Sequence, residues 1–249
     1  MNLLAIDSAG LLLSVALSRG DEIFYEEAAE GMRQSELVMD FIDSLLKKAS
    51  LKPCDLNGIL CMGGPGSFTG LRIGYSIAKG LALSLSIPFA TVPTLDCIAC
   101  QLTINSEQST ANCGIDAQSP LQLAVIQARK NAWFYAFYKG EERLTPDGDG
   151  DAFQIAEEIK KYKEQIILTG PGSALLFESL PEEKRAGIIL KNGNRKTSGA
   201  ASFGYAQELL YIAKKINIPD NKSAACLFSG PEYIRKTDAE LNFDMKAGV

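Results

Sequence analysis

A dense run of glycine residues, from Gly63 to Gly74, constrains this 249-residue chain more than any other feature. Four glycines fall within eight positions there, and each loses more backbone entropy on folding than another residue would. Such a run is retained where the backbone must adopt a positive φ, expose its N–H groups or let another group approach closely. It predicts a turn between a buried strand and a helix over 68–85, with Ser67 and Thr69 as candidate N-caps. The turn belongs either to a binding site or to a tight connection that packs the helix on its own sheet.

Two nucleotide-binding motifs fail to match this run. It lacks the Lys-Ser/Thr ending of a P-loop, and its best alignment with G-x-G-x-x-G, starting at Gly64, ends in threonine. The helix that follows carries small residues four positions apart, which places them on one face. That stripe would allow close approach by a partner helix or by the chain's own sheet. It consists of Gly70, Gly74, Ala78 and Ala82.

Composition narrows the chemistry that the chain can perform. The sequence contains no histidine, which excludes Ser-His-Asp hydrolysis, Cys-His proteolysis and His-ligated zinc or iron sites. A formal net charge of −5 argues against an independent grip on nucleic-acid phosphates. Cys97 and Cys100 have metal-ligand spacing but follow a helical apolar pattern, so we expect buried thiols and no metal. Because the sequence has no apolar run of membrane-spanning length and no signal peptide, we expect a cytoplasmic protein without membrane contact.

Apolar periodicity predicts an α/β chain of two lobes. A first lobe over 1–102 is followed by a polar boundary over 103–120 and a smaller second lobe over 121–199. A final helix over 200–215 is expected to pack back on the first lobe, and 216–249 to form a tail. No internal sequence repeat is evident. The predicted strands are 2–7, 11–18, 22–28, 57–62, 88–92, 121–127, 132–138 and 165–169, and the predicted helices are 34–49, 68–85, 94–102, 153–163 and 200–215.

Three segments resemble the bacterial TsaB (YeaZ) family: Leu3–Ser8, the glycine run, and Pro231–Lys236. The resemblance covers most of the chain, is densest over 1–102 and returns over 231–240. It implies an actin-like (ASKHA) two-lobe α/β fold with a complete first lobe and a reduced second lobe. It also implies a non-catalytic subunit of the complex that forms N6-threonylcarbamoyladenosine at position 37 of tRNAs. The implied partners are the catalytic subunit TsaD, bound as a heterodimer, and the ATPase TsaE, with tRNA reached only through the complex.

In actin-like proteins two β-hairpins cradle the nucleotide phosphates and a glycine turn holds the adenosine. The resemblance places vestiges of this site at Asp7, Ser8, Gln127, Arg129, Gly170 and Gly172. Gln127 stands where the family usually has an acid, the turn after it has no glycine, and Pro171 removes a backbone donor. We therefore expect this chain alone to bind no cofactor, with ATP and metal held by the partner subunits. At Gln34 the family typically carries a histidine, and the matching helix of TsaD supplies histidine metal ligands.

The resemblance also implies pairing through the helices that correspond to 34–49 and 68–85. The resemblance therefore implies a surface for TsaD, or for a second copy of the chain, on Ser35, Val38, Phe41, Ile42, Leu45, Gly70, Arg72, Gly74, Ile77, Ala78 and Leu81. An independent actin-fold ATPase or small-molecule kinase is the first alternative, which the altered phosphate hairpins disfavour. A peptidase is the second, which the absence of histidine disfavours.

Overall fold

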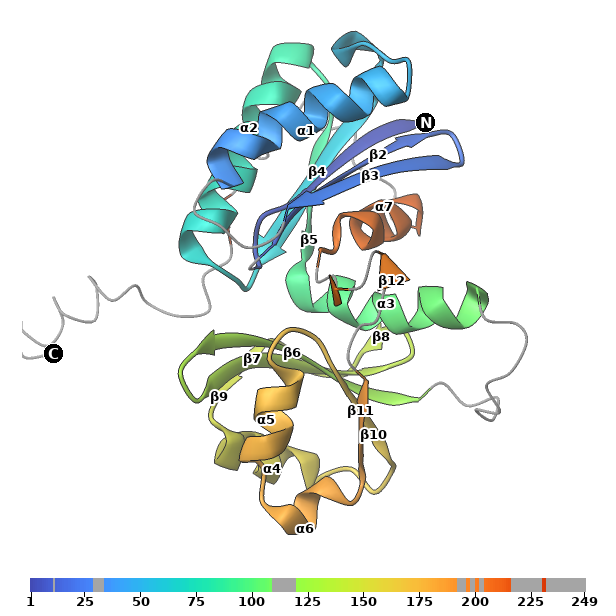
Figure 1. Ribbon diagram of the computed structural model, residues 1–249. Helices are drawn as coiled ribbons and strands as arrows, with labels where there is room; N and C mark the ends of the chain where they lie inside the picture. Colours follow the sequence, from blue (N-terminus) through green and yellow to red (C-terminus); the bar gives the residue numbers. More distant parts are fainter. Residues whose placement is uncertain are drawn as a thin grey trace, which may run out of the picture.

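Two large β-sheets divide the described part of the chain into two lobes, with two helices between them (Figure 1). The computed structural model describes residues 1–10, 12–28, 34–108, 120–191, 196–197, 200–201, 204–215 and 230–231. Residues 109–119 of the predicted boundary, most of the predicted tail, and the family motif from residue 232 onward lie outside the described residues.

The first sheet has the strand order β3-β2-β1-β4-β5. Strand β1 lies at its centre, antiparallel to β2 and parallel to β4. Both β1 and β4 are buried on both faces, which is why each is a nearly continuous apolar run instead of an alternating one. The strands are β1 (Asn2–Asp7), β2 (Leu13–Arg19), β3 (Glu22–Ala28), β4 (Gly58–Gly64) and β5 (Phe89–Pro93).

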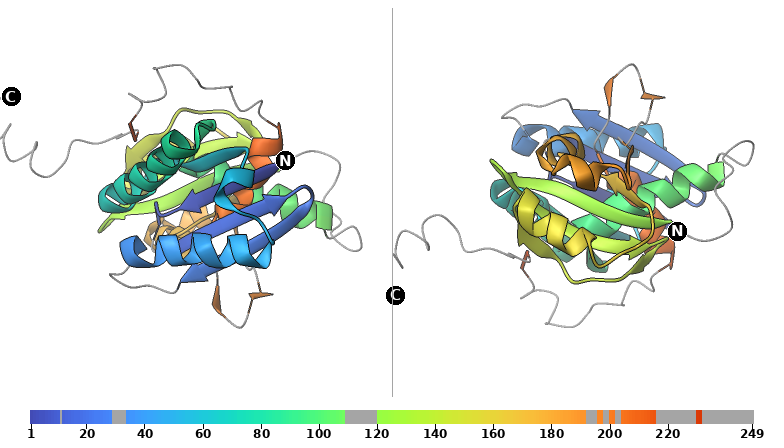
Figure 2. Two further views of the ribbon diagram at one scale, coloured as in Figure 1. Left: turned by 90° about the horizontal axis from the view of Figure 1, so that it is seen from above. Right: turned by 90° about the horizontal axis from the view of Figure 1, so that it is seen from below.

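Helices α1 (Gln34–Lys48) and α2 (Phe68–Leu85) cover the outer face of this sheet (Figure 2, left). Helix α1 packs on β2 and β3, and α2 packs on β4. Their inward side chains form one apolar cluster with the strands. Glu36 lies in the first turn of α1 and Lys47 and Lys48 in its last, which complements the helix dipole. A short 3-10 helix, η1 (Pro53–Asp55), connects α1 to β4.

The second sheet repeats the same strand order as β8-β7-β6-β10-β11, with β9 paired to β7. Its central strand β6 is antiparallel to β7 and parallel to β10. Two short helices, α4 and α5, cover its outer face (Figure 2, right). The elements are β6 (Leu121–Arg129), β7 (Ala132–Lys139), β8 (Glu142–Arg143), β9 (Gly148–Gly150), α4 (Ala152–Ile159), β10 (Ile166–Thr169), α5 (Ser173–Ser179), α6 (Glu182–Arg185) and β11 (Ile188–Lys191).

Helices α3 (Thr94–Gln108) and α7 (Ala206–Lys215) lie between the two sheets (Figure 1). Helix α7 packs against β1, β2 and α3, and α3 also packs against β6. One cluster of buried apolar side chains joins both helices to both sheets. The region between the lobes is therefore a continuous core. The small strands β12 (Lys196–Thr197) and β13 (Ala200–Ala201) pair with each other.

Three predicted helix boundaries are wrong. Helix α3 continues to Gln108, into the predicted polar boundary, because no glycine or proline interrupts residues 103–108. The predicted helix over 200–215 begins only at Ala206, because side chains of the first lobe bind the N–H groups of Tyr205 and Ala206 and so fix the start of α7 there. Helix α4 ends at Ile159 instead of Lys163.

Polar contacts at the corner between β7 and β8 hold both inner helices. Asp96 of α3 accepts hydrogen bonds from the Tyr138 hydroxyl at 2.7 Å and from Arg143 Nε at 2.8 Å. Lys215 of α7 lies 2.6 Å from Glu141 Oε1. The second lobe is thus joined to α3 and α7 by ion pairs as well as by the shared core.

Candidate functional site

The first glycine turn packs α2 directly onto the turn after β1. The Ser67 hydroxyl caps α2 by accepting the N–H of Gly70 at 3.2 Å, and the Ser67 N–H donates to the Ala9 carbonyl at 2.7 Å. A Cβ at Gly70 would lie 1.8 Å from the Ser8 carbonyl oxygen, and one at Gly66 would lie 2.6 Å from that of Ala9. Close packing within the chain therefore requires these glycines. Of the two candidate N-caps, only Ser67 serves.

The stripe of small residues on α2 faces the chain's own sheet, so its prediction as a partner surface is wrong. Gly70 is buried, and a Cβ at Gly74 would lie 2.6 Å from Ser8 Oγ. Ala78 is fully buried and Ala82 nearly so, both in the cluster beneath α1 and α2. The tight internal connection is the alternative that the structure contains.

The other predicted interface residues divide by exposure. Three are buried beneath α1 and cannot reach a partner in the folded chain: Val38, Ile42 and Leu45. Five reach the surface fully or in part: Ser35, Phe41, Arg72, Ile77 and Leu81. The sequence reasoning missed three exposed residues on the outward side of α2: Ser76, Gly80 and Leu83, the last 64% exposed. The same helical spacing, applied to the opposite face of α2, would have found them.

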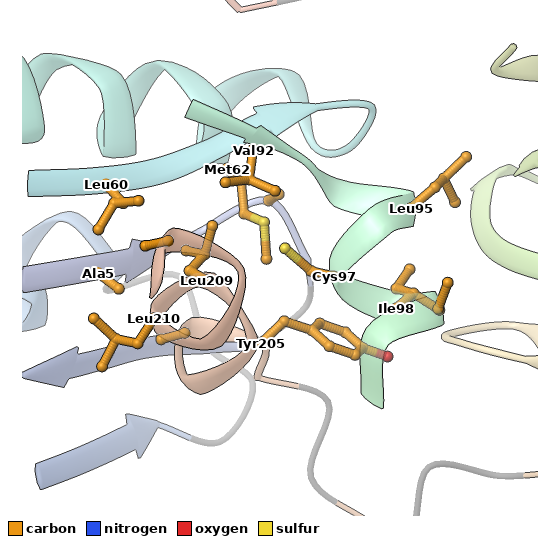
Figure 3. Packing of buried hydrophobic residues seen from close by; sticks show 14 of the residues in the cluster. Ala5, Leu60, Met62, Val92, Leu95, Cys97, Ile98, Tyr205, Leu209 and Leu210 are labelled. Atoms are coloured by element: carbon orange, nitrogen blue, oxygen red, sulfur yellow. The ribbon is translucent and has the colours of Figure 1, made fainter. Parts of the chain in front are cut away.

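Asp7, at the end of β1, is buried under the start of α7. Its Oδ1 accepts the N–H of Ala9 at 3.0 Å and its Oδ2 that of Tyr205 at 2.8 Å. Burial raises the pKa of Asp7 from 3.8 to about 6, and the two N–H groups offset this only in part. Figure 3 shows the Tyr205 ring pointing from α7 toward α3. Nothing in the sequence pattern could pair residues 198 positions apart.

The second glycine turn packs in a similar way against the hairpin of its own lobe. The Gln127 N–H donates to the Pro171 carbonyl at 3.0 Å, and a Cβ at Gly172 would lie 2.9 Å from the Gln127 Cβ. Gly170 has a φ of +108°, which glycine adopts readily. The structure thus brings Gln127, Gly170 and Gly172 together, whereas Arg129 is exposed toward the tip of the hairpin.

Trp133 of β7 is hydrogen-bonded to this turn, and no sequence pattern pointed to it. Its indole N–H donates to the Gly172 carbonyl at 3.1 Å, and the residue is fully buried. It is the single tryptophan of the sequence. A large aromatic side chain with one polar atom is thereby both packed and hydrogen-bonded.

At two positions in these turns, the backbone N–H groups differ from those of an actin-like nucleotide site. Phosphates in such sites are bound by backbone N–H groups that point into an open cleft. Here the Ala9 N–H is bound by Asp7 and the Gln127 N–H by Pro171. Ser8 and Ala9 are also buried. The donors at these positions are already used within the chain.

The cysteine pair lies in the core, as expected for buried thiols. Cys97 and Cys100 of α3 are buried, and desolvation raises the pKa of Cys97 well above its usual value. Within the described parts of the chain, no group of three or more His, Cys, Asp or Glu could hold a metal ion. Among the helices that the structure describes, none is long and apolar enough to cross a membrane.

Known proteins are similar to this chain over nearly its whole length. The family model described as "TsaD: tRNA N6-adenosine threonylcarbamoyltransferase" matches residues 28–243. The tRNA threonylcarbamoyladenosine biosynthesis protein TsaB of Bacillus subtilis is 39% identical over 248 residues, which cover 98% of each chain. The chain belongs to the TsaB family. TsaB of Escherichia coli is 26% identical over 96% of each chain.

Solved structures agree with the fold of this TsaB-family chain. YeaZ from Pseudomonas aeruginosa matches with a TM-score of 0.68 at 21% identity, covering 86% of this chain and 91% of that one. A structure described as similar to the peptidase YeaZ from Pseudomonas aeruginosa matches with a TM-score of 0.73 at 19% identity, covering 94% and 99%. The predicted family and the actin-like (ASKHA) fold are confirmed.

Proposed function

We propose that this TsaB-family chain is a non-catalytic subunit of the cytoplasmic complex that forms N6-threonylcarbamoyladenosine at position 37 of tRNAs. It acts by dimerising with the catalytic subunit TsaD, the ATPase TsaE joins the complex, and tRNA is reached through the complex. The observation that carries the proposal is the 39% identity to Bacillus subtilis TsaB over 98% of both chains.

The residues of the chain support a role without chemistry of its own. The sequence contains no histidine for general acid–base work or metal binding. Asp7, the carboxylate at the first hairpin, is buried and bound by two backbone N–H groups. ATP and metal then belong to the partner subunits. Calorimetry of the isolated chain with ATP is expected to detect no low-micromolar binding, and tight binding would contradict this part of the proposal.

The outward side of α1 and α2 is the proposed surface for TsaD. Ser76 and Gly80 are exposed and small, and a Cβ at Gly80 would meet no atom within 4 Å. A partner helix could therefore approach α2 at the short end of the usual interaxial range of roughly 8–10 Å. Leu83 and the half-buried Ile77 and Leu81 supply apolar area beside these small residues. Met39 of α1, 46% exposed, adds to the same side of the lobe.

The substitution Gly80→Glu tests this surface. The position is exposed in the interior of α2, where glutamate is a better helix former than glycine, so the variant should fold. A bulky charge at the centre of the contact is expected to weaken binding to the organism's own TsaD by on the order of a hundredfold, measured by co-purification and titration.

Gly187→Glu is the matched control, because Gly187 is also exposed with no atom within 4 Å of its Cβ position, but lies in the second lobe. This variant should bind TsaD as the unmodified chain does. A folded Gly80→Glu variant with unchanged affinity would refute the surface. If the unmodified chain fails to bind TsaD at all, the proposed function itself is refuted.

A further inference from the structure

The start of α7 is attached to the first lobe by contacts from three different strands. The Tyr205 N–H donates to Asp7 of β1 at 2.8 Å, and the Ala206 N–H donates to Ser14 Oγ of β2 at 3.2 Å. The Tyr25 hydroxyl of β3 lies 3.4 Å from the Gly204 carbonyl. These bonds connect parts of the chain more than 170 positions apart, so α7 can separate from the first lobe only by breaking them together.

The shortest of these contacts uses a carboxylate inside an apolar core. Asp7 is 1% exposed, and it forms no ion pair with any residue that the structure describes. Its two oxygens accept one backbone N–H each, from its own turn and from the start of α7. A buried carboxylate satisfied only by neutral donors retains a large desolvation cost when it is ionised. Burial accordingly raises its pKa to about 6.

The groups around Asp7 leave it as the side chain most suited to change its charge near neutral pH. Cys61 of β4 and Cys97 of α3 sense its charge, and burial raises the pKa of both thiols, so they stay neutral. Other titratable groups on the elements packed around this region include Asp96 and Cys100 of α3, Glu208 of α7, Tyr205 just before α7, Lys79 of α2, and Tyr25 and Glu27 of β3. Glu208 is the nearest competitor, because it is buried in α7 and Cys97 senses its charge as well.

We propose that α7 is a proton-linked latch, in which uptake of a proton by Asp7 tightens the seating of α7 on the first lobe and loss of that proton loosens it. The seated state holds the Asp7 proton more strongly than an open state in which the carboxyl is hydrated. The seated state therefore gains stability as the pH falls through about 6, and the gain levels off near 3.8, where the hydrated carboxyl also binds its proton. Opening would expose the apolar core between α7, β1 and β2, which gives the latch a local and measurable readout.

Amide hydrogen exchange of the full chain at pH 5 and pH 8, corrected for the intrinsic exchange rates, tests the proposal. Protection of the α7 amides is expected to be about tenfold greater at pH 5 than at pH 8, from the pKa difference between the seated and open states. In Asp7→Asn, whose side chain stays neutral, protection should no longer depend on pH. A carbon NMR titration of the Asp7 carboxyl in the unmodified chain gives a second measurement that needs no variant, and it should show a midpoint near 6.

Asp21→Asn is the matched control, because the fully exposed Asp21 lies 3.4 Å from Lys214 at the other end of α7. In this variant the α7 amides should still be about tenfold better protected at pH 5 than at pH 8. The assignment to Asp7 would be overturned if the pH dependence of α7 protection disappeared in Glu208→Gln but persisted in Asp7→Asn. Equal protection at both pH values in the unmodified chain, or an Asp7 midpoint near 4, would overturn the latch.

Discussion

The two lobes share one strand order but differ in the helices that cover them. In each, a central strand is antiparallel to the strand after it and parallel to the strand that precedes the glycine turn. The helix after that turn has 18 residues in the first lobe, α2, and only 7 in the second, α5. The second lobe is thus reduced in its helices, while its sheet is complete.

The residues that follow the two glycine turns explain why the helices after them differ in length. Gly64-Pro65-Gly66-Ser67 and Gly170-Pro171-Gly172-Ser173 are the same four residue types at equivalent places, and Gly64 and Gly170 both have a φ of +108°. After the second turn, Pro181 forces Leu180 into an extended conformation and ends α5. After the first turn no proline occurs before Pro88, so α2 continues. One turn sequence therefore serves two helix lengths, and the residues that follow it decide between them.

Adding one methyl group at Gly70, in the first turn of α2, or at Gly170, in the second glycine turn, should strongly destabilise the lobe that contains it. Gly70→Ala is expected to lower the free energy of unfolding by about 4 kcal/mol or more, because its Cβ would lie 1.8 Å from the Ser8 carbonyl oxygen. Gly170→Ala should cost a similar amount, since its Cβ would lie 2.1 Å from the Val125 carbonyl oxygen at a positive φ. Urea denaturation measures both. Gly80→Ala is the control and should add up to about 1 kcal/mol; near-equal stabilities for the Gly70 and Gly80 variants would contradict the packing.

A glutamate introduced on either side of α2 should show by its effect on stability which side is buried and which is exposed. Ala78→Glu is expected to lower the free energy of unfolding by about 3 kcal/mol or more, because it buries a carboxylate in the cluster beneath α1 and α2. Leu83→Glu, at a residue 64% exposed, should change it by no more than about 0.5 kcal/mol. Thermal unfolding followed by circular dichroism compares them. A well-folded Ala78→Glu variant would mean that α2 presents the opposite face to the sheet.

The smallest effects compare a helix cap from each lobe. Ser67→Ala removes the acceptor for the Gly70 N–H at the start of α2, and Asp151→Ala removes the acceptor for the Gln154 N–H at the start of α4. Each should lower the free energy of unfolding by about 1 kcal/mol. If probes of both lobes report the same loss of stability for each variant, the lobes unfold together, as their shared core suggests. A loss confined to probes of one lobe would show that they unfold separately.

The sequence predicted eight strands to within a few residues because their apolar runs are clear, and the helix over 68–85 has the predicted bounds. It missed the short strands β8, β9, β11, β12 and β13 and the short helices α5 and α6, whose two to seven residues carry too little periodicity to be recognised. It did not show which side of the helix over 68–85 faces inward, because small residues lie on both sides: Gly70, Gly74 and Ala78 inside, Ser76 and Gly80 outside. The role of Tyr205 depends on a contact with Asp7 across nearly the whole chain, which no local pattern encodes. The recurring Gly-Pro-Gly-Ser turn was present in the sequence, but four residues are too few to mark a repeat until the sheets are compared.

The position of Trp133 has a practical consequence for spectroscopy. As the single tryptophan, buried under the Gly172 turn, it places all of the intrinsic tryptophan emission in the second lobe. Fluorescence will therefore follow the exposure of this indole, while circular dichroism will follow mainly the long helices α1, α2 and α3. Agreement of the two signals in one denaturation experiment would show a single cooperative transition. A ligand that touches only α1 and α2 should leave the emission spectrum unchanged.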